Sequence, residues 1–475
     1  MNWSTLASEL DGNLVLPGDS TYDLLRQPFN QRIDRRPAAI ARCVSESDVV
    51  ACVRFAAASS VNVTCRSGGH GAEGYCSIDG ALMIDQSAMQ DVLVDTEENV
   101  VHVGAGASWG QVDIATYPRG LAAPGGGCAA VGVSGLSQGG GLGPIARTWG
   151  LTIDNVLSVR IVTARDVAPI VADATQNKEL FWALRGGGGG NFGAVTRFTY
   201  RLRPIGRELL GGMLVYKWAD AKAVFQFFRE WMNGDDDERL TLLPMFFFAH
   251  GNAPMAGISA FYNGDPEEAF DYIQDILAAA KMPDPVNGPL DQALVRGTLP
   301  AYTGTESTTA WPGSGQYWRS GFLDNDFPDE AIDTFLSWFE KCPPPPPGRA
   351  RRTGASTFKQ DDLSFGFIES LGGAIERVGK ADTAFYWRDQ RFSFTFIGIY
   401  DTTEATWAAQ TRDWAVAFRK AMETYFAGGV YVNYMQADLA DWQHAYYGEH
   451  YERLRAVKDE YDPQHMFRFP QDLQQ

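Results

Sequence analysis

Glycine is concentrated in one stretch of this 475-residue chain, and the concentration limits what that stretch can form. Residues 104–143 contain 13 of the 50 glycines of the chain. Glycine loses more backbone freedom on folding than any other residue and weakens both helices and strands. We therefore predict a long irregular coil over residues 104–143, and a long coil inside a compact domain usually has a function.

Two nucleophilic side chains lie inside glycine-rich sequences. His70 lies in residues 66–71 (RSGGHG), and Cys128 lies in residues 124–132 (PGGGCAAVG). Glycine-rich loops let the backbone approach a flat ligand and direct N–H groups at anionic oxygens. The pair is typical of two attachment points for one large cofactor. The alternative interpretation is a buried histidine and an inert core cysteine.

Other motifs are weaker than these two. Residues 141–146 fit G-x-G-x-x-A, but no strand precedes them and a proline interrupts them, which disfavours a dinucleotide-binding fold. Neither a Walker A sequence nor a G-x-S-x-G serine motif is present. Cys65, His70 and Cys76 lack the tight cysteine pairs of structural zinc sites, so we predict no metal site. A Cys65–Cys76 disulfide stays open at this point.

The composition indicates a large globular protein and excludes some partners. The length allows about three domains of ~150 residues or two larger ones, and 45% apolar residues are ample for their cores. The net charge of −18 repels phosphate groups, so we expect neither nucleic-acid nor membrane-surface binding. No run of 18 apolar residues exists to span a membrane. The N-terminus lacks a signal sequence, which predicts a cytoplasmic protein or a processed secreted one. Nothing in the sequence indicates an oligomeric state.

Hydrophobic patterns predict mixed helix and sheet. Residues 38–67 are typical of a strand, a helix capped by Ser45 or Ser47, and a second strand. Alternating and β-branched sequences predict further strands, at 81–95, 99–107 and 157–164. From about residue 207 glycine thins and aromatic residues increase. There residues 391–400 predict a strand with two distinct faces, and residues 402–426 predict a long amphipathic helix.

Nearly the whole chain resembles the berberine bridge enzyme-like flavoenzymes, in which FAD is attached at two points. These enzymes belong to the vanillyl-alcohol oxidase and p-cresol methylhydroxylase superfamily. The resemblance rests on several stretches, at residues 66–71, 81–95, 147–155, 181–196, 431–434, 446–454 and 458–463. Gly71 and Ala72 depart from the family, which often has a serine and an aromatic residue after the histidine.

The resemblance implies an α+β fold of two domains. Residues 1–206 and 430–475 are expected to form an FAD-binding domain of two small subdomains. Residues 207–429 are expected to form a substrate-binding domain, with a large antiparallel sheet backed by helices. The change of composition near residue 207 agrees with this division.

The resemblance also implies FAD as the cofactor, joined covalently to His70 and Cys128. A neutral imidazole and a thiolate are able to attack the methyl group and the C6 position of a flavin, while glycine N–H groups hold its diphosphate. The other residues expected to bind FAD are Arg66, Ser67, Gly68, Gly69, Gly71, Gly132, Gly135, Gly140, Val195 and Asn433.

The implied activity is an oxidase that takes hydride from an alcohol or hemiacetal carbon. Its small-molecule substrate would be a sugar, an oligosaccharide or a glycosylated or secondary metabolite, and dioxygen would become hydrogen peroxide. Two other functions stay open: a flavin dehydrogenase with another electron acceptor, and a flavin-binding protein without turnover.

Six further residues have expected roles in this reaction. Tyr434 is the candidate general base; its phenol, with an ordinary pKa of about 10, needs a suitable neighbour, and the alternative is a packed tyrosine. Asp361 or Asp362 is expected to supply a second acid–base or positioning group. Ser393 and Thr395 share one face of their strand and are expected to line the cleft. Val131 resembles the residue that admits dioxygen in the oxidases.

Overall fold

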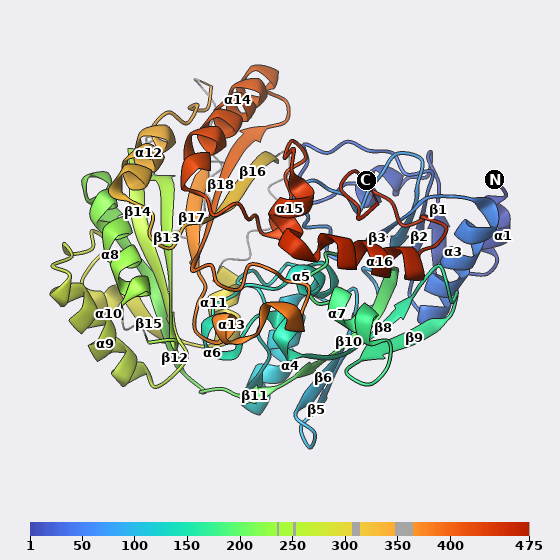
Figure 1. The fold of residues 1–475 in the computed structure, drawn as a ribbon, viewed down its shortest axis with the longest axis horizontal. Coiled ribbons are helices and arrows are strands. Elements are labelled where there is room, and N and C mark those ends of the chain that lie inside the picture. The colour runs from blue at the N-terminus through green and yellow to red at the C-terminus, as the bar shows by residue number, and fades with distance from the viewer. Residues whose placement is uncertain (235–236, 250–252, 306–313, 347–363, 475) are drawn as a thin grey trace.

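Two bodies of secondary structure lie side by side in the computed structural model (Figure 1). The structure describes most of the chain, as residues 1–234, 237–249, 253–305, 314–346 and 364–474. Both termini lie in the body that holds the N-terminal strands, drawn in blue and green. Strands up to residue 204 form that body, and strands from residue 209 onward form the other.

The first body begins with a small mixed sheet in the order β1-β2-β4-β3. Its strands are β1 (Asn13–Val15), β2 (Ala39–Arg42), β3 (Val63–Arg66) and β4 (Leu82–Asp85). Helix α3 (Glu46–Ser59) packs on this sheet and begins at a capping box, in which the Ser45 side chain accepts a hydrogen bond from the Asp48 N–H. The predicted strand–helix–strand unit with Ser45 as its cap is therefore confirmed.

A five-stranded antiparallel sheet, in the order β5-β6-β10-β8-β9, completes the first body. Its strands are β5 (Val92–Asp95), β6 (Val100–Gly104), β8 (Val156–Val162), β9 (Pro169–Asp173) and β10 (Ala194–Arg201). The end of the chain returns here, because helix α16 (Tyr451–Tyr461) buries Leu454 and Val457 in the core of this sheet. Phe467 also forms a bridge with Val63 of β3.

The second body is a seven-stranded sheet in the order β15-β12-β14-β13-β17-β18-β16. Every neighbouring pair in it is antiparallel. Its strands are β12 (Leu209–Lys217), β13 (Leu240–Ala249), β14 (Ala253–Tyr262), β15 (Leu294–Gly297), β16 (Ser314–Leu323), β17 (Phe365–Ser370) and β18 (Phe392–Asp401). The predicted strand at 391–400 and the expected large antiparallel sheet are both confirmed.

Helices cover the outer face of the large sheet (Figure 1). They are α8 (Ala221–Asn233), α9 (Pro266–Ala279), α12 (Asp329–Phe339) and α14 (Ala405–Met422). Phenylalanines from both layers fill the core between them, among them Phe225, Phe246, Phe335, Phe396 and Phe418. Each such side chain contributes about 1.5–3 kcal/mol when it is fully buried. The sheet therefore presents only its inner face to the first body.

The prediction of a continuous coil over residues 104–143 is wrong. Helix α4 (Trp109–Thr116) and helix α5 (Val133–Gly139) lie within this stretch. A capping box at Ser108 and Gln111 begins α4, and only one glycine, Gly110, lies inside that helix. Ten of the 13 glycines lie outside these two helices, but Gly135 and Gly139 lie inside α5, where tertiary packing overrides the low helix propensity of glycine.

Short elements connect these layers. The helices among them are α1 (Trp3–Ala7), α2 (Tyr22–Leu25), α6 (Ala146–Trp149), α7 (Lys178–Ala183), α10 (Leu290–Ala293), α11 (Leu299–Thr305), α13 (Ala374–Arg377) and α15 (Trp442–Tyr447). Two short strands, β7 (Leu121–Ala122) and β11 (Arg203–Pro204), pair with each other. The 3₁₀ turns are η1 (Tyr117–Arg119), η2 (Thr152–Asn155), η3 (Trp218–Asp220), η4 (Lys380–Asp382), η5 (Glu423–Tyr425), η6 (Val432–Tyr434) and η7 (Gly448–His450).

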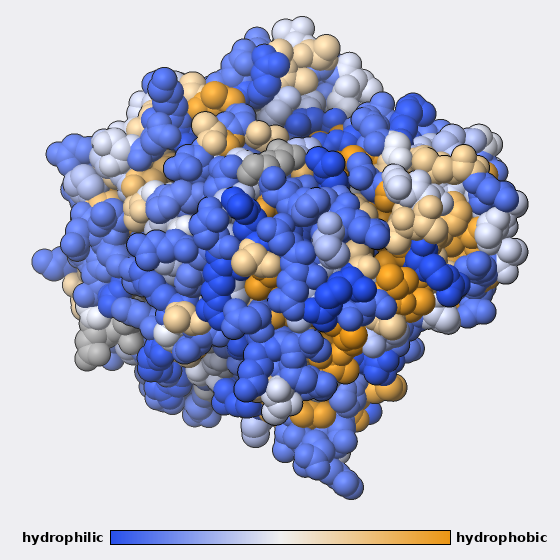
Figure 2. All heavy atoms as spheres, turned by 45° about the vertical axis from the view of Figure 1, so that its right-hand side comes forward, coloured by the Kyte–Doolittle hydropathy of each residue, from blue (hydrophilic) through white to orange (hydrophobic). Residues whose placement is uncertain are grey.

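The surface is consistent with the acidic composition. Figure 2 shows a mostly hydrophilic face on which hydrophobic residues form small, separate patches. None of the described helices combines the length and the apolar composition that a membrane crossing requires. We propose the predicted domain boundaries, 1–206 with 430–475 and 207–429, because every strand of the large sheet lies between residues 209 and 401.

Candidate active site

The two glycine-rich loops cross each other at van der Waals distance. A methyl group placed on Gly68 would lie 2.6 Å from the backbone nitrogen of Gly132, and one placed on Gly132 would lie 2.4 Å from the nitrogen of Gly68. Ser67 anchors the first loop, because its hydroxyl donates a 2.6 Å hydrogen bond to the Ala105 carbonyl. Side chains at either glycine would separate the loops. The crossing therefore holds the His70 and Cys128 loops in one fixed arrangement.

His70 is a half-buried, neutral imidazole. Its ring stacks on Phe29 with 4.5 Å between ring centroids and 20° between planes. Burial, together with the nearby positive charge of Arg66, lowers the pKa of His70 to about 4. The ring is therefore unprotonated at neutral pH, which leaves a nitrogen lone pair available for bonding.

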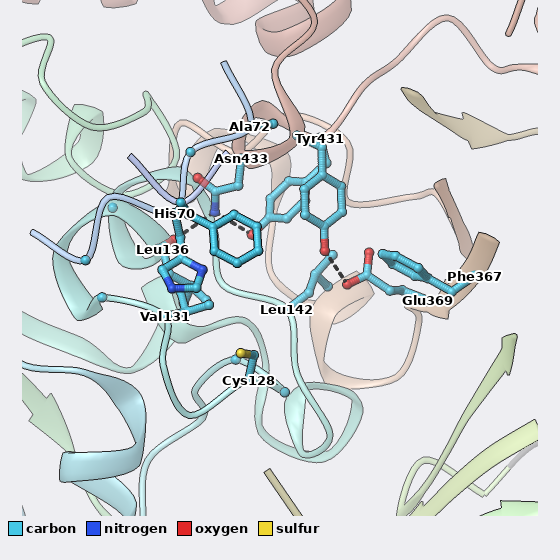
Figure 3. Close-up of a pocket in the computed structure, with 18 of the residues that line it drawn as sticks. His70, Ala72, Cys128, Val131, Leu136, Leu142, Phe367, Glu369, Tyr431 and Asn433 are labelled. Carbon is cyan, nitrogen blue, oxygen red and sulfur yellow. Dashed lines mark hydrogen bonds between the residues drawn. The ribbon is translucent and has the colours of Figure 1, made fainter. Parts of the chain in front are cut away.

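Cys128 lies in the second loop and lines the same cavity as His70 (Figure 3). The backbone carbonyl of Cys128 accepts a hydrogen bond from the Val131 N–H at 3.2 Å. The Val131 carbonyl in turn accepts one from Trp109 at the start of α4, at 3.0 Å. These bonds fix the position of Val131 on the wall next to Cys128.

His70, Cys128 and Val131 line one cavity of about 840 Å³ between the two bodies of the molecule. We call residues 67–71 and 126–132 the loop side of this cavity. The sheet side is the inner face of the large sheet. It presents Met213, Met245, Phe261, Trp318, Phe367 and Ile397, together with Glu369.

An acid–base pair stands on the sheet side. The Tyr434 hydroxyl donates a 2.9 Å hydrogen bond to Glu369 Oε1, and the Ser393 hydroxyl donates one of 2.9 Å to Oε2. Desolvation in the cavity wall raises the pKa of Glu369 to about 7, although both hydrogen bonds act to lower it. A carboxyl group with such a pKa exchanges protons near neutral pH, and Tyr434 is bonded directly to it.

Aromatic rings enclose Tyr434. Its ring centroid lies 5.2 Å from that of Trp318 and 6.2 Å from that of Phe367. Tyr431 stands edge-on to Tyr434 at 5.0 Å. The hydroxyl of Tyr434 therefore meets its carboxylate partner in surroundings that are otherwise mostly apolar.

Asn433 ties the C-terminal segment to the glycine-rich segment. Its amide donates hydrogen bonds to the Leu136 carbonyl at 3.0 Å and to the Tyr431 hydroxyl at 2.7 Å. The Tyr431 hydroxyl also accepts a 2.7 Å bond from the Gly141 N–H, and burial raises the pKa of this tyrosine. Asn433 lines the cavity on the other side from Glu369 (Figure 3).

The cavity walls fit a flat, polar-edged cofactor such as FAD. Gly71 and Gly135 both line the cavity, and a methyl group added to either would meet no atom within 4 Å. Gln138 also lines the cavity, and its amide nitrogen donates hydrogen bonds to Ser134. Its buried Oε1 has no hydrogen-bond partner among the described residues. A buried acceptor without a partner is costly, and an N–H or O–H donor of a bound cofactor would satisfy it.

Several predicted FAD-binding residues lie behind the cavity wall instead of in it. Arg66 donates a hydrogen bond to the Leu25 carbonyl. The Val195 carbonyl accepts a 2.6 Å bond from Gln86, which does line the cavity. Gly140 packs against the ring of Tyr431. These three residues would therefore support residues that line the cavity.

The structure corrects the placement of the predicted substrate contacts. Ser393 and Thr395 share one face of β18, but neither lines the cavity. Ser393 is bonded to Glu369, and Thr395 is fully buried beside its cross-strand neighbour Phe367, whose larger ring forms the wall. Asp361 and Asp362 lie outside the described residues.

The structure also decides the question of Cys65 and Cys76. Both are thiols and not a disulfide, and burial raises the pKa of each. Within the described ranges, no group of three or more His, Cys, Asp or Glu side chains is arranged to hold a metal ion.

Glu369 was not among the predicted site residues. A signal was present in residues 365–370 (FGFIES), where Phe365, Phe367 and Glu369 alternate with smaller or aliphatic residues. Alternation puts these three side chains on one face of a strand. A carboxylate on the same face as two phenylalanines is unusual, and it marks a site where burial perturbs a pKa.

Comparison with known proteins agrees with this geometry. The family profile described as "FAD binding domain" matches residues 37–172, and the profile "Berberine and berberine like" matches residues 430–473. The crystal structure of berberine bridge enzyme from Eschscholzia californica has the same fold, with a TM-score of 0.86 at 20% identity over 99% of this chain and 98% of that one. The α+β fold of two domains is therefore confirmed.

Two sequence relatives align over almost the whole chain. The Bacillus subtilis (strain 168) protein named "Uncharacterized FAD-linked oxidoreductase YgaK" is 30% identical over 98% of this chain and 97% of its own. Xylooligosaccharide oxidase from Thermothelomyces thermophilus (strain ATCC 42464 / BCRC 31852 / DSM 1799) is 27% identical over 94% of this chain and 89% of its own. The chain belongs to the berberine bridge enzyme-like family of FAD-linked oxidoreductases, within the vanillyl-alcohol oxidase and p-cresol methylhydroxylase superfamily.

Proposed function

We propose that this oxidoreductase is an oxidase that converts a CH–OH group of a small molecule to a carbonyl group. Dioxygen accepts the two electrons and the two protons and leaves as hydrogen peroxide. The observation that carries this proposal is the Tyr434–Glu369 pair, which stands in the same cavity as His70 and Cys128. One side of the cavity thus holds groups that move a proton, and the other holds groups suited to bind a redox cofactor.

His70 and Cys128 would each form one covalent bond to FAD. The pKa of His70, near 4, keeps its imidazole neutral and nucleophilic at neutral pH. The cofactor held in this way would supply two-electron redox chemistry, with dioxygen as the final electron acceptor. A cofactor that is fixed by bonds need not be deeply enclosed to stay bound, so the cavity can remain open to substrate.

Tyr434 and Glu369 would take the proton of the substrate hydroxyl. The Tyr434 oxygen accepts that proton while its own proton passes to Glu369 Oε1 along the existing 2.9 Å hydrogen bond. Glu369 is therefore the neighbour that Tyr434 requires, because the phenol passes its proton directly to a carboxylate and not to water. When bound, FAD supplies the acceptor for the hydride that leaves the substrate carbon.

Val131 supports dioxygen as the electron acceptor. It lies on the loop side next to Cys128, and its side chain lines the cavity. Valine leaves more room there than leucine would, and one methylene is enough to decide whether a small apolar molecule enters a packed site. A dehydrogenase with another acceptor is the second candidate, favoured only if the reduced protein reacts slowly with air.

The substrate would carry its reacting carbon on a sugar, an oligosaccharide or a glycosylated or secondary metabolite. Xylooligosaccharide oxidase and the carbohydrate oxidase of Microdochium nivale, 26% identical over 96% of this chain and 91% of its own, support the sugar branch by their names. In every branch the reacting group is a hydroxyl-bearing carbon that Tyr434 can reach.

Anaerobic mixing with a panel of sugars, aromatic alcohols and alkaloids tests the proposal. A substrate should bleach the yellow colour of the bound flavin, and admission of air should restore the colour with formation of one equivalent of hydrogen peroxide. Bleaching without recovery in air would identify a dehydrogenase. If no compound bleaches a flavin that dithionite reduces readily, the protein binds flavin without turnover.

A further inference from the structure

The sheet side of the cavity is covered by apolar side chains that stay partly exposed. Six of them line the cavity and are only half-buried: Met213, Leu243, Met245, Trp318, Phe365 and Phe367. Their neighbours along the strands, such as Leu242, Phe246 and Ile368, point to the helix layer and are fully buried. The half-buried residues therefore expose apolar surface to the cavity, and an apolar ligand would remove that surface from water.

These side chains form one continuous surface, because the strand register places them opposite one another. Met245 of β13 pairs with Phe367 of β17. Ile397 of β18 pairs with Phe365 on one side and with Trp318 on the other. Phe365 and Phe367 stack with 5.9 Å between ring centroids and 25° between planes. The surface runs without a polar interruption from Met245 to Trp318.

The polar groups of the sheet side are already hydrogen-bonded within the protein. The Ser259 hydroxyl is bonded to the Tyr302 hydroxyl at 2.8 Å, and Tyr302 donates to the Ala260 carbonyl at 2.6 Å. Gln316 Oε1 accepts a 2.8 Å bond from the Trp318 indole, and the Gln316 amide nitrogen is 3.4 Å from the Ser314 hydroxyl. A ligand with many hydroxyl groups would find few partners among them.

Charged groups near the cavity do not change this conclusion. Arg296 of β15 and Gln292, just before that strand, also line the cavity, at the edge of the sheet. Both are exposed, and Arg296 is paired with Glu267 at 3.2 Å. Among the described residues of the six strands other than β15, the one carboxylate on the cavity-facing surface is Glu369, which is hydrogen-bonded to Tyr434. These six strands thus offer one carboxylate, paired with Tyr434, while Ser259 and Gln316 are hydrogen-bonded within the protein and the other side chains named above are apolar.

We propose that the substrate is an alcohol carried by a hydrophobic ring, and not a carbohydrate. This inference rests on the proposed function and narrows its substrate class. The ring lies on the Met245–Phe367–Phe365–Trp318 surface, and the single reacting hydroxyl forms a hydrogen bond with Tyr434. The carbinol carbon loses a hydride to FAD and its hydroxyl loses a proton to the Tyr434–Glu369 pair, so the product is the corresponding aldehyde or ketone, with dioxygen reduced to hydrogen peroxide. Each sugar hydroxyl left without a partner would weaken binding by roughly tenfold.

The test compares one ring-bearing alcohol with two sugars on the flavin-loaded protein. The probes are 4-isopropylbenzyl alcohol, glucose and xylobiose, and the readouts are anaerobic flavin reduction and the spectral shift of the oxidised flavin on binding. We expect the ratio of reduction rate to Kd to be at least about 100-fold higher for the ring-bearing alcohol. A higher ratio for either sugar overturns the inference and leaves the proposed oxidase function intact.

Binding to the Tyr434→Phe variant separates the two proposals. This variant keeps the apolar surface but lacks the hydroxyl that removes the proton. Binding of 4-isopropylbenzyl alcohol to it with a Kd at least tenfold below that of xylobiose supports the inference, whatever the reduction rates are. Failure of the alcohol to shift the flavin spectrum at millimolar concentration overturns it. If the alcohol binds but does not reduce the wild-type flavin, the proposed function fails and the inference about binding stands.

A matched pair of substitutions tests the surface itself. Met245→Gln changes the side chain from apolar to polar at nearly constant size, whereas Met245→Leu keeps it apolar. We expect the glutamine variant to bind 4-isopropylbenzyl alcohol roughly tenfold more weakly and the leucine variant to bind within threefold of the wild type. Equal effects of the two substitutions would show that the ring does not contact Met245 and would overturn this placement.

Discussion

The loop side and the sheet side of the cavity differ in which atoms of the polypeptide form their surfaces. The loop side is made by backbone, and at the Gly68–Gly132 crossing no side chain fits on either residue. The sheet side is made by side chains that project from regular strands, so Met245 or Phe367 can change without altering the backbone that carries them. We therefore propose that the loop side holds the cofactor and that the sheet side selects the substrate.

Loss of both attachment points is the strongest way to test the loop side. The double variant His70→Ala/Cys128→Ala should lose all covalently bound FAD, whereas each single variant should keep it through the remaining bond. Fluorescence of acid-denatured protein on a gel measures this directly. The control is His102→Ala/Cys342→Ala, which removes one histidine and one cysteine that do not line the cavity and should leave the flavin attached. Release of flavin from the denatured wild type would refute the attachment.

On the sheet side, the largest effect is expected at the acid–base pair. Tyr434→Phe removes one hydroxyl and almost no volume, so flavin content and folding should persist. Flavin reduction by substrate should slow by roughly 10²–10⁴-fold, which is the usual contribution of a general base. Glu369→Gln should act in the same range, because it removes the final proton acceptor.

The matched control for this experiment is Tyr117→Phe. Tyr117 donates hydrogen bonds to the Gly206 and Arg207 carbonyls, away from the cavity. Stopped-flow reduction of this control should match the wild type. Wild-type kinetics in Tyr434→Phe would move the role of the base to another residue.

The two sides also differ in how far the sequence could predict them. His70 and Cys128 stand in short local motifs, so their importance is readable without any knowledge of the fold. The Tyr434–Glu369 contact joins residues 65 positions apart, and it depends on the register of β17 in a seven-stranded sheet. No local pattern encodes that register, so the pairing of Tyr434 with Glu369 could not be predicted from the sequence. The expected roles of Asp361 and Asp362 stay predictions, because both lie outside the described residues.

Helix content was predictable where caps and periodicity agreed, and not where tertiary packing decided. Helix α3 was located from its Ser45 cap, whereas α5 contains Gly135 and Gly139 and has no side-chain cap. Helices of this kind are stabilised mainly by what they pack against, here by the core that includes Val133. The low helix propensity of glycine predicted a coil over residues 104–143, but tertiary packing stabilises a helix there.

Val131 provides a test in which the loop side should affect only one half of the reaction. Val131→Leu adds one methylene near the expected position of the cofactor, and reoxidation of the reduced enzyme by dioxygen should slow by roughly 10–100-fold. Reduction by substrate should stay within about twofold. Val131→Ala is the control in the opposite direction and should reoxidise at least as fast as the wild type. Slow reoxidation of the wild type in aerated stopped-flow mixing would favour the dehydrogenase alternative.

The smallest expected effect, and the most specific to the sheet side, is at Ser393. Its hydroxyl donates to Glu369 Oε2 at 2.9 Å and acts to lower the pKa of Glu369, which burial nevertheless raises to about 7. Glu369 accepts a proton only when it is ionised, so flavin reduction by the wild type should increase as the pH rises through about 7. Ser393→Ala should shift this increase to higher pH, with a few-fold loss of rate at pH 6 and little loss at pH 9.

The stability of the protein should follow the opposite trend, which gives an independent check on the same carboxyl group. The pKa of Glu369 is higher in the folded chain than its ordinary value of 4.5, so folding is favoured by its protonated form. Its contribution to the free energy of unfolding is fully present below about pH 4.5 and is lost as the pH rises through about 7. Glu369→Gln should remove this dependence and raise Tm by roughly 1–2 °C at pH 8.

Ser370→Ala, on the other face of β17, is the control for Ser393→Ala and should leave the pH profile of reduction unchanged. A pH profile that is the same in Ser393→Ala and the wild type would mean that Glu369 is not the group whose ionisation limits the reaction.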